Sequence, residues 1–499
     1  MRNCRWNEGP IVTWMETLAH YWQDIAAWTG VIDFVMIVVV VPWVLAIKKE
    51  AISAIAWCLT VILVPIFGAV LFVLFGYQSV HRPLKRKVRH RREFRVRNPA
   101  GRAPQHAEAD KAEDPAETWE GMGRLARRLD AYPVTAGNKL TFYSEGRPAF
   151  DDMLAAIRAA THHVHLEFFI FQYDTLGRQF LELLAEKAKQ GIEVRLLYDA
   201  MGSRKMSWWR LRKLRAAGGK YAAFLPVSLF RRRIQVNLRN HRKILVVDGK
   251  VAFTGGINIG DEYLGKNKRL GHWRDTALRM EGPAVESLQR TFIEDWDFAF
   301  GESLEGESYF QADPEAGSEE VQVIQSGPDQ EVKAIREIYL AAVFKARRRL
   351  WVTSPYYVPD QGLRDALCLA GRTGIDVRLL LPLEADHLGV HYASLYYIRD
   401  LLDAGVKVYQ YTNGFIHSKV WLADGKWASV GSANLDNRSL LLNFELNCLI
   451  YTPQDVADLE KQYERDLEQS ILMEPTVFAK RPFASKLAEN FFRLFSPVL

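Results

Sequence analysis

Apolar residues form two long runs near the start of the chain. The run from Ala51 to Tyr77 has no charged residue over 27 positions, which is long enough to cross the ~30 Å hydrocarbon core of a bilayer as a helix. The earlier run, from Ile25 to Ile47, is interrupted only by Asp33. Because only residues 48–50 separate the runs, we expect residues 1–80 to form a two-helix transmembrane hairpin.

Basic residues cluster directly after the second run. Residues 81–102, called the basic collar below, hold ten Lys or Arg and one Glu, a local charge of +9. Since the whole chain carries +6, the rest sums to +6 − 9 = −3, which argues against a general nucleic-acid binder. The positive-inside rule places the collar and everything after it in the cytoplasm, with the N-terminal tail on the same side. The collar either contacts anionic head groups or only sets the topology, and the two roles are compatible.

Composition places the rest of the chain among globular proteins. The 499 residues are 48% hydrophobic and 25% charged, enough for roughly two to four domains with sizeable cores. Residues 103–136 are Ala-, Glu-, Asp- and Pro-rich at their start and are expected to be a linker. Neither a disulfide scaffold nor a structural zinc site is expected, because the four cysteines are far apart. They are Cys4, Cys58, Cys368 and Cys448.

One motif occurs twice in the second part of the chain. Residues 241–258 read HRKILVVDGKVAFTGGIN, and residues 417–434 read HSKVWLADGKWASVGSAN. Counted from the histidine, both have Lys at +2, Asp at +7, Gly at +8, Lys at +9, Gly at +14 and Asn at +17. The apolar stretches GIEVRLLYD (191–199) and GIDVRLLLP (374–382) precede them in the same order. The repetition predicts a duplicated unit.

Each copy of the motif predicts a β-hairpin. His241 and Lys243 lead into a β-branched run, Asp248-Gly249 is a turn signal, and Lys250–Thr254 returns as the partner strand. The second copy repeats this around Asp424-Gly425. Because residues i and i+2 of a strand point to the same face, each copy presents an imidazole beside an ammonium group.

These residues suit phosphoryl or phosphatidyl transfer. One neutral imidazole can attack phosphorus, and a second can protonate the leaving alcohol and deprotonate the incoming one. Lysines, asparagines and backbone amides can neutralise the charge that grows on the phosphate oxygens, so we expect no metal and no cofactor. The aspartates of the turns are also expected to orient the neighbouring histidine or lysine. The catalytic candidates are His241, Lys243, Asp248, His417, Lys419 and Asp424, and the substrate-binding candidates are Gly256, Asn258, Ser432 and Asn434.

Two acids and three histidines stand in apolar surroundings. Glu167 and Glu445 would be costly to bury unpaired, so they either orient the site histidines or lysines or pair elsewhere. His162, His163 and His165 precede an apolar run. This setting favours a helix end leading into a strand over a metal cluster.

Two further segments combine aromatic and basic residues. The C-terminal stretch LAENFFRLFSPVL (487–499) suits either a membrane surface or a solvated amphipathic helix. For the pair Trp208 and Trp209 we favour the membrane surface. Its basic neighbours are Arg204, Lys205, Arg210, Arg212, Lys213 and Arg215.

The duplicated H-x-K-x4-D pattern resembles the phospholipase D superfamily. Within it, bacterial cardiolipin synthases with an N-terminal membrane hairpin are similar over nearly the whole chain, including VHLEFFIF (164–171) and GFIHSKVWLADGKWASVGSANLDNRSLLLNFELN (414–447). The resemblance implies an α/β fold in which two pseudo-symmetric α/β/α sandwich halves share one active site. The halves would be residues 137–320 and 321–480, followed by a tail, residues 481–499.

The resemblance also implies a reaction, in which two phosphatidylglycerols give cardiolipin and glycerol. His241 would be the nucleophile and His417 the general acid and base, and the site would open towards the bilayer. The implied partners are phosphatidylglycerol, other anionic phospholipids and the membrane, with no nucleic acid. The implied location is the inner membrane of a bacterium, with a cytoplasmic catalytic domain. A hydrolytic phospholipase D or another head-group exchange enzyme is the alternative.

Overall fold

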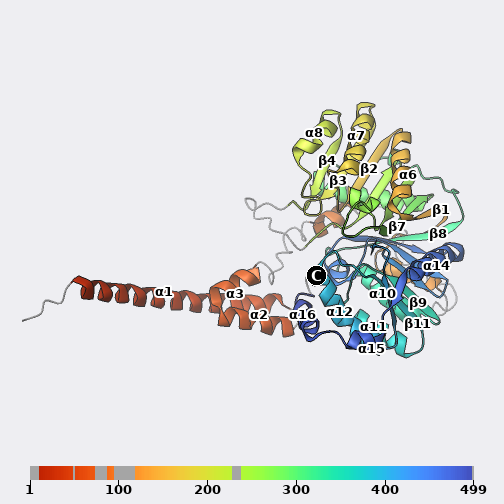
Figure 1. The fold of residues 1–499 in the computed structure, drawn as a ribbon. Helices are drawn as coiled ribbons and strands as arrows, with labels where there is room; N and C mark the ends of the chain where they lie inside the picture. The colour runs from red at the N-terminus through yellow and green to blue at the C-terminus, as the bar shows by residue number, and fades with distance from the viewer. Residues whose placement is uncertain (1–9, 49–50, 74–86, 95–118, 227–237, 497–499) are drawn as a thin grey trace, which may run out of the picture. The chain divides into compact units, whose positions relative to one another are not determined.

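The structure is a computed structural model that describes residues 10–48, 51–73, 87–94, 119–226 and 238–496. The chain divides into two compact units, Met1–Pro83 and Leu84–Leu499. Figure 1 draws both units as a ribbon.

Within its described residues, the first unit contains the apolar helices α1 (Pro10–Ile47), α2 (Ala51–Leu63) and α3 (Pro65–Leu71). Within α1, Trp28–Ile47 is 20 residues long and is the one segment of the described chain that is long and apolar enough to cross a bilayer. The 13 residues of α2 extend over only about 20 Å, which is short of the ~30 Å hydrocarbon core.

The second apolar run does not form the single spanning helix that its length predicts. The helix breaks at Val64, whose φ of −140° and ψ of 76° lie outside the helical region, and Pro65 opens α3. Proline has no N–H to donate and its ring collides with the preceding turn, so it starts a new helix instead of continuing α2. Residues 74–77, the end of the expected span, lie outside the described residues.

After the break, α3 folds back along α2. A Cβ placed on Gly68 would lie 2.4 Å from the carbonyl oxygen of Thr60, so only glycine permits this approach. The ring of Phe72, just after α3, lies 5.5 Å from the ring of Trp57 in α2 and 5.6 Å from that of Trp43 in α1. The chain therefore turns at residue 64 and runs back along α2.

Part of the basic collar belongs to the second unit and is buried there. Residues 87–94 form a helix, in which Lys87 donates to Asp295 at 2.6 Å and Arg91 donates to Asp329 at 3.2 Å. Neither basic side chain is exposed, so these two charges serve internal ion pairs and not lipid head groups. Residues 81–86 and 95–102 lie outside the described residues.

The second unit is built on one continuous sheet whose strand order is β18-β12-β11-β9-β14-β15-β17-β8-β1-β7-β6-β5-β2-β3-β4. The order mirrors itself about the β8–β1 pair, so each half contributes an equivalent series of strands. The first half holds β1 (Val134–Glu145), β2 (His163–Phe168), β3 (Glu193–Asp199), β4 (Lys220–Phe224), β5 (Lys243–Val247), β6 (Val251–Gly255) and β7 (Trp273–Glu281). The second holds β8 (Glu319–Ser326), β9 (Arg349–Thr353), β11 (Asp376–Pro382), β12 (Lys407–Tyr411), β14 (Val420–Ala423), β15 (Trp427–Gly431), β17 (Glu445–Ile450) and β18 (Ser470–Leu472).

Helices cover both faces of each half of the sheet (Figure 1). Alternate strand residues face opposite sides: Leu245 and Val247 pack in the core cluster with α6, α7 and α8, whereas Ile244 and Val246 pack against α9. In the second half, α10, α11 and α12 cover one face and α14 covers the other. The predicted α/β fold of two pseudo-symmetric α/β/α halves is thus confirmed. These helices are α6 (Gly146–Ala159), α7 (Thr175–Lys189), α8 (Trp208–Ala216), α9 (Ala284–Phe300), α10 (Ala334–Lys345), α11 (Gln361–Arg372), α12 (Leu388–Asp403) and α14 (Pro453–Glu468).

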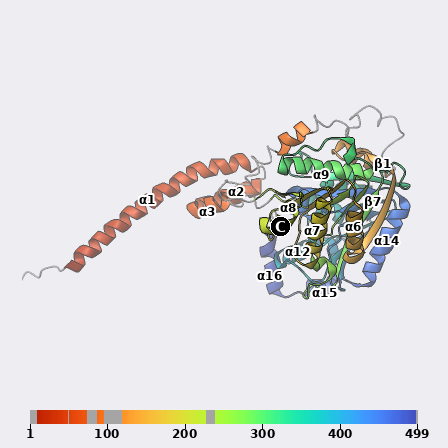
Figure 2. The ribbon, with the colours of Figure 1, turned by 90° about the horizontal axis from the view of Figure 1, so that it is seen from above.

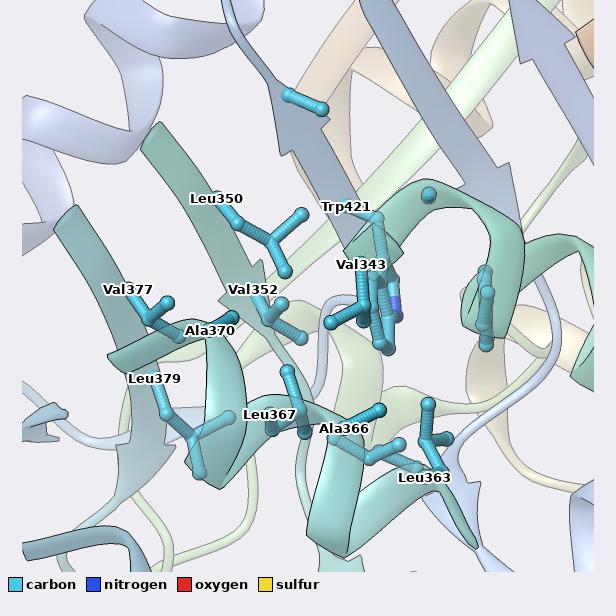
Figure 3. Packing of buried hydrophobic residues seen from close by; sticks show 14 of the residues in the cluster. Val343, Leu350, Val352, Leu363, Ala366, Leu367, Ala370, Val377, Leu379 and Trp421 are labelled. Atoms are coloured by element: carbon cyan, nitrogen blue, oxygen red, sulfur yellow. The ribbon is translucent and has the colours of Figure 1, made fainter. Parts of the chain in front are cut away.

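The largest core cluster lies in the second half, where α10 and α11 rest on β9 and β11 (Figure 3). Leu350 and Val352 of β9 point towards the apolar side of α11, and each is almost fully buried. Burying one such side chain stabilises the fold by about 1.5–3 kcal/mol. This packing supports β9, which pairs with β14, the strand that directly follows His417 and Lys419.

The expected linker is partly folded. Helix α5 (Glu120–Arg128) lies within it, and Trp119 stacks on Trp427 with ring centroids 5.7 Å apart. Few large apolar residues precede Leu125, but this one tryptophan finds a partner some 300 residues away in the second half. Residues 103–118 lie outside the described residues.

Candidate active site

The two predicted hairpins are present. β5 pairs with β6, and β14 pairs with β15, both antiparallel. Their turns place Asp248 and Gly249 at φ of 54° and 65°, and Asp424 and Gly425 at φ of 55° and 69°. Two consecutive positive φ angles are typical of the tight hairpin turn that favours an Asp-Gly sequence.

Each catalytic segment is hydrogen-bonded to the opposite half. The backbone N–H of His241 donates to the carbonyl of Phe444 at 2.9 Å, and that of His417 donates to the carbonyl of Arg274 at 2.7 Å. In addition, β13 (Phe415–Ile416), directly before His417, pairs in parallel with β7 of the first half. The two motifs therefore meet where the halves join.

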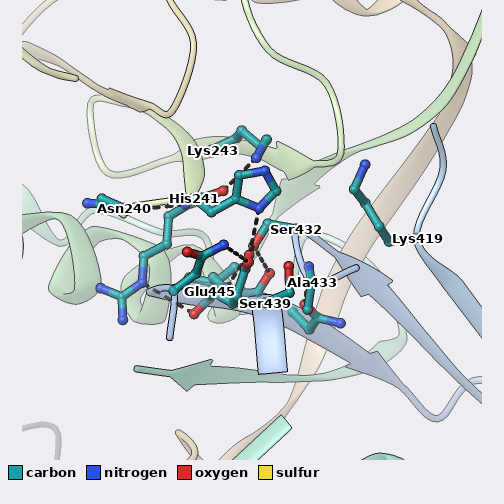
Figure 4. Close-up of polar contacts among 12 residues, drawn as sticks. Asn240, His241, Lys243, Lys419, Ser432, Ala433, Ser439 and Glu445 are labelled. Atoms are coloured by element: carbon teal, nitrogen blue, oxygen red, sulfur yellow. Dashed lines mark hydrogen bonds and ion pairs between the residues drawn. The ribbon is translucent and has the colours of Figure 1, made fainter. Parts of the chain in front are cut away.

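A carboxylate of the second half holds the histidine of the first. Nδ1 of His241 lies 3.0 Å from Oε2 of Glu445, and the hydroxyl of Ser432 donates to the same oxygen at 2.5 Å (Figure 4). Burial opposes ionisation of Glu445, but the facing His241 and the nearby Lys243 hold its pKa below the usual value. Glu445 thus contacts His241, the contact that the orienting role requires; the role itself stays a prediction.

The second histidine is held in the same way, by a carboxylate of the first half. Nδ1 of His417 lies 2.7 Å from Oδ2 of Asp275, on β7 of the first half. The other oxygen of Asp275 accepts from the N–H of Thr276 at 2.8 Å. Sequence reasoning missed Asp275, although an acid inside the apolar strand WRDTALRM carries the same signal as Glu445.

Two buried lysines complete the site. The Lys243 ammonium donates to the carbonyl of His241 at 2.5 Å, and Nζ of Lys419 lies 3.0 Å from Nε2 of His417. Burial lowers the pKa of Lys243 to about 7 and that of Lys419 to about 8. Lys419 also acts electrostatically on His241 and on Glu445, so the charged groups of the two motifs influence one another. Figure 4 shows Lys243 beside His241, with Lys419 on the other side of Ser432.

The same burial favours the neutral form of both imidazoles. It lowers the pKa of His241 to about 4, against the opposing effect of Glu445. Burial and the Lys419 ammonium also lower the pKa of His417. Since Nδ1 of His241 donates to Glu445, its lone pair is at Nε2, where a nucleophile needs it.

The motif aspartates do not orient the histidines or lysines, contrary to expectation. Asp248 accepts from the backbone N–H groups of residues 161–163 at 2.8–2.9 Å. Asp424 accepts from those of residues 347–349 at 2.8–3.0 Å. Each aspartate lies at the far end of its strand from the catalytic lysine, where it fixes the loop between a helix and the neighbouring strand.

The substrate-binding candidates mostly position other groups. The amide of Asn258 accepts from the N–H of Ile170 at 3.0 Å and donates to the hydroxyl of Tyr263 at 3.0 Å, so it holds a loop. Ser432 holds Glu445, as above, and a Cβ on Gly256 would lie 2.0 Å from Oδ1 of Asp275. Asn434 is buried, and its Oδ1 has no hydrogen-bond partner among the described residues.

Glu167 does not contact either histidine. It accepts from the amide of Asn240 at 2.6 Å, and burial together with Asp295 raises its pKa. His163 begins strand β2, as predicted, and His165 stacks on Phe292 at 4.5 Å. Among the described residues, no group of three or more potential ligands could hold a metal ion.

The paired histidine–lysine hairpins on a duplicated α/β/α scaffold define a phospholipase D-like enzyme. A family model described as "Cardiolipin synthase, PLD-like domain" matches residues 153–296 and 339–467. The chain belongs to this cardiolipin synthase family of phosphatidyltransferases, which are membrane-associated enzymes.

Curated relatives agree with this assignment, and one solved structure shares the fold. The cardiolipin synthase of Geobacillus kaustophilus is 40% identical over 91% of this chain and 90% of its own length. Cardiolipin synthase 2 of Bacillus cereus is 42% identical over 76% of this chain and 74% of its own. The phosphatidylserine synthase of Haemophilus influenzae shares the fold, with a TM-score of 0.58 at 16% identity, over 76% of this chain and all of its own.

Proposed function

We propose that the enzyme joins two phosphatidylglycerols to give cardiolipin and glycerol through a phosphohistidine. One observation carries the proposal: two buried imidazoles, each held by a carboxylate of the opposite half, share a site with two ammonium groups. The relatives named cardiolipin synthase support the choice of lipid substrate.

In the first step, Nε2 of His241 attacks phosphorus and the bond from phosphorus to the glycerol oxygen breaks. The imidazolium of His417 gives its proton to that oxygen, so glycerol leaves as a neutral alcohol. The anionic phosphodiester raises the pKa of His417 when it binds, which supplies the protonated form. Lys243 and Lys419 stabilise the charge that grows on the non-bridging oxygens.

In the second step, the free hydroxyl of another phosphatidylglycerol attacks the phosphohistidine. His417, now neutral, takes the hydroxyl proton, and the bond from phosphorus to Nε2 of His241 breaks. The sequence conserves charge and restores both histidines to their starting protonation states. Transfer requires that the lipid alcohol reach the site in preference to water.

Purified enzyme in detergent with phosphatidylglycerol alone tests the reaction. We expect cardiolipin and free glycerol in equal amounts, whereas phosphatidic acid as the sole lipid product would identify a hydrolase. His241→Ala and His417→Ala should each lower kcat by several orders of magnitude. Substantial turnover in either variant would contradict the shared site.

We also propose a topology for the first unit, in which α1 spans a bacterial inner membrane and α2 with α3 forms a re-entrant pair. The return of α3 along α2 brings the end of α3 back towards the start of α2, and the collar follows in the sequence. Residues 1–24 carry two basic and three acidic residues. The positive-inside rule then places the catalytic unit in the cytoplasm and the N-terminus on the opposite side.

Reporter fusions distinguish this topology from a two-span hairpin. A cytoplasm-specific reporter should be active after Val80 in both arrangements. At the N-terminus it should be inactive if α2 and α3 are re-entrant, and an active reporter there would restore the hairpin.

A further inference from the structure

Helix α8 presents large apolar side chains to solvent. Trp208 and Trp209 open this helix, are 60% and 58% exposed, and stack on each other. Met201, in the loop that leads to α8, is 40% exposed. Exposed tryptophans grouped in this way mark an interaction surface more often than a solvated helix face.

Helix α16 (Phe483–Arg493) presents a second apolar surface. One face of the helix is packed: Glu489 is buried against Arg481, and Phe492 stacks on Tyr392 of α12 at 5.8 Å. The opposite face forms an exposed stripe at helical spacing, called the α16 stripe below. Its members are Phe483, Leu487, Phe491, Leu494 and Phe495, all at least 45% exposed.

Both helices are tied to the active site. Asp199 ends β3, and the loop that follows leads to α8; its carboxylate accepts from the backbone N–H of Asn240 at 3.0 Å, next to His241. After α16, the carbonyl of Ser496 accepts from the amide of Asn437 at 3.2 Å, three residues beyond the motif residue Asn434. Figures 1 and 2 show α8 and α16 along the same side of the second unit, with α14 on the other.

The same two segments are rich in positive charge. Residues 200–216, around α8, hold six basic and no acidic residues. Residues 480–496, around α16, hold four basic residues, and their one acid is the buried Glu489. Apolar side chains ringed by cations complement an anionic lipid surface, in which the apolar groups enter the head-group region and the cations meet phosphates.

We propose that Trp208, Trp209 and the α16 stripe form one docking face that seats the catalytic unit on an anionic bilayer, with the active site opening at that surface. The inference rests on the proposed function, because it supplies the route by which two membrane lipids reach His241 and His417. A membrane anchor alone would hold the enzyme near the bilayer without orienting the site towards it.

Comparing turnover on a bilayer substrate with turnover on a monomeric lipid separates an effect on docking from an effect on the chemical steps. Full-length Trp209→Asp and Leu487→Asp variants in phosphatidylglycerol nanodiscs should lose at least tenfold in turnover. On monomeric dihexanoyl phosphatidylglycerol, both should remain within twofold of the unsubstituted enzyme. Phe344→Asp is the matched control, because Phe344 is 62% exposed against 60% for Leu487 but lies at the end of α10, before β9 begins; it should be normal in both assays.

Equal losses on the two substrates would show damage to the site, and unchanged turnover in nanodiscs would overturn the docking face. If the unsubstituted enzyme makes no cardiolipin from the monomeric lipid, the proposed function fails separately.

A direct measurement of docking uses a fluorophore attached to Leu487→Cys or to Lys461→Cys, with the native cysteines replaced by alanine. Doxyl lipids should quench the label at 487 at least threefold more than the label at 461 on α14. Equal quenching would refute the proposal and leave the face to another partner.

Discussion

Substituting Gly256 by alanine should disable the enzyme through a carboxylate that the substitution does not alter. The new Cβ would lie 2.0 Å from Oδ1 of Asp275, whereas real contacts of this kind stay beyond 3.0 Å, so the carboxylate must move by about 1 Å. Asp275 is fully buried and holds His417 at 2.7 Å, so this movement breaks the hydrogen bond. A hydrogen bond to a charged group contributes about 1.5–3 kcal/mol, which corresponds to a loss of about 10- to 150-fold in kcat.

A double-mutant cycle identifies the route of the effect. Asp275→Asn should lower kcat by up to about 10⁴-fold, as expected where an amide favours the wrong imidazole tautomer. If Gly256→Ala acts through Asp275, the double variant should be no slower than Asp275→Asn alone. Additive losses in kcat, or a Gly256→Ala enzyme with normal turnover, would refute the reasoning. Ser432→Ala is the control at the equivalent position, because it adds no atoms; it removes one hydrogen bond to the charged Glu445 and should cost about 10- to 150-fold in kcat, independently of Asp275.

Three further predictions concern charge. kcat/KM should fall as pH rises through about 7 to about 8, because Lys243 and Lys419 lose their ammonium charge in the free enzyme; a flat profile from about pH 6 to 9 would contradict this. Lys87→Met should lower the melting temperature, since Asp295 loses a buried partner at 2.6 Å at a cost of about 3–5 kcal/mol, while the exposed Lys461→Met should not. Asp424→Asn should lower stability but leave kcat per folded molecule within about threefold, and loss of kcat without loss of stability would restore the orienting role.

The two hairpins and their His-x-Lys pairs could be predicted, because neighbouring residues alone determine them. An Asp-Gly pair between β-branched runs strongly favours a hairpin, and a two-residue spacing places His241 and Lys243 on one face. The duplication then supplied the second pair, and the resemblance to the phospholipase D superfamily supplied the α/β fold. The contacts of Asp248 could not be predicted in this way, since its partners come from the loop before β2, about 85 residues away.

Burial and long-range pairing explain the other differences. A count of positive charges treats every basic residue of the collar alike, but Lys87 meets Asp295 across 208 positions and is withdrawn from solvent. A count of apolar residues likewise gave a span from Ala51 to Tyr77, without the fold-back that Pro65 starts and Gly68 permits. In the sequence, Asp275 stands out only as an acid within an apolar strand. Its partner, His417, belongs to the other half and could be found only from the structure.

The crossed pairing gives a reason for the duplication itself. His241 of the first half depends on Glu445 of the second, and His417 of the second half depends on Asp275 of the first. A half on its own would therefore contain a histidine without its carboxylate and a carboxylate without its histidine. Because an unpaired buried charge costs several kcal/mol, the junction between the halves and the active site must form together. Substitutions that loosen the junction should therefore lower turnover even where they touch no catalytic side chain.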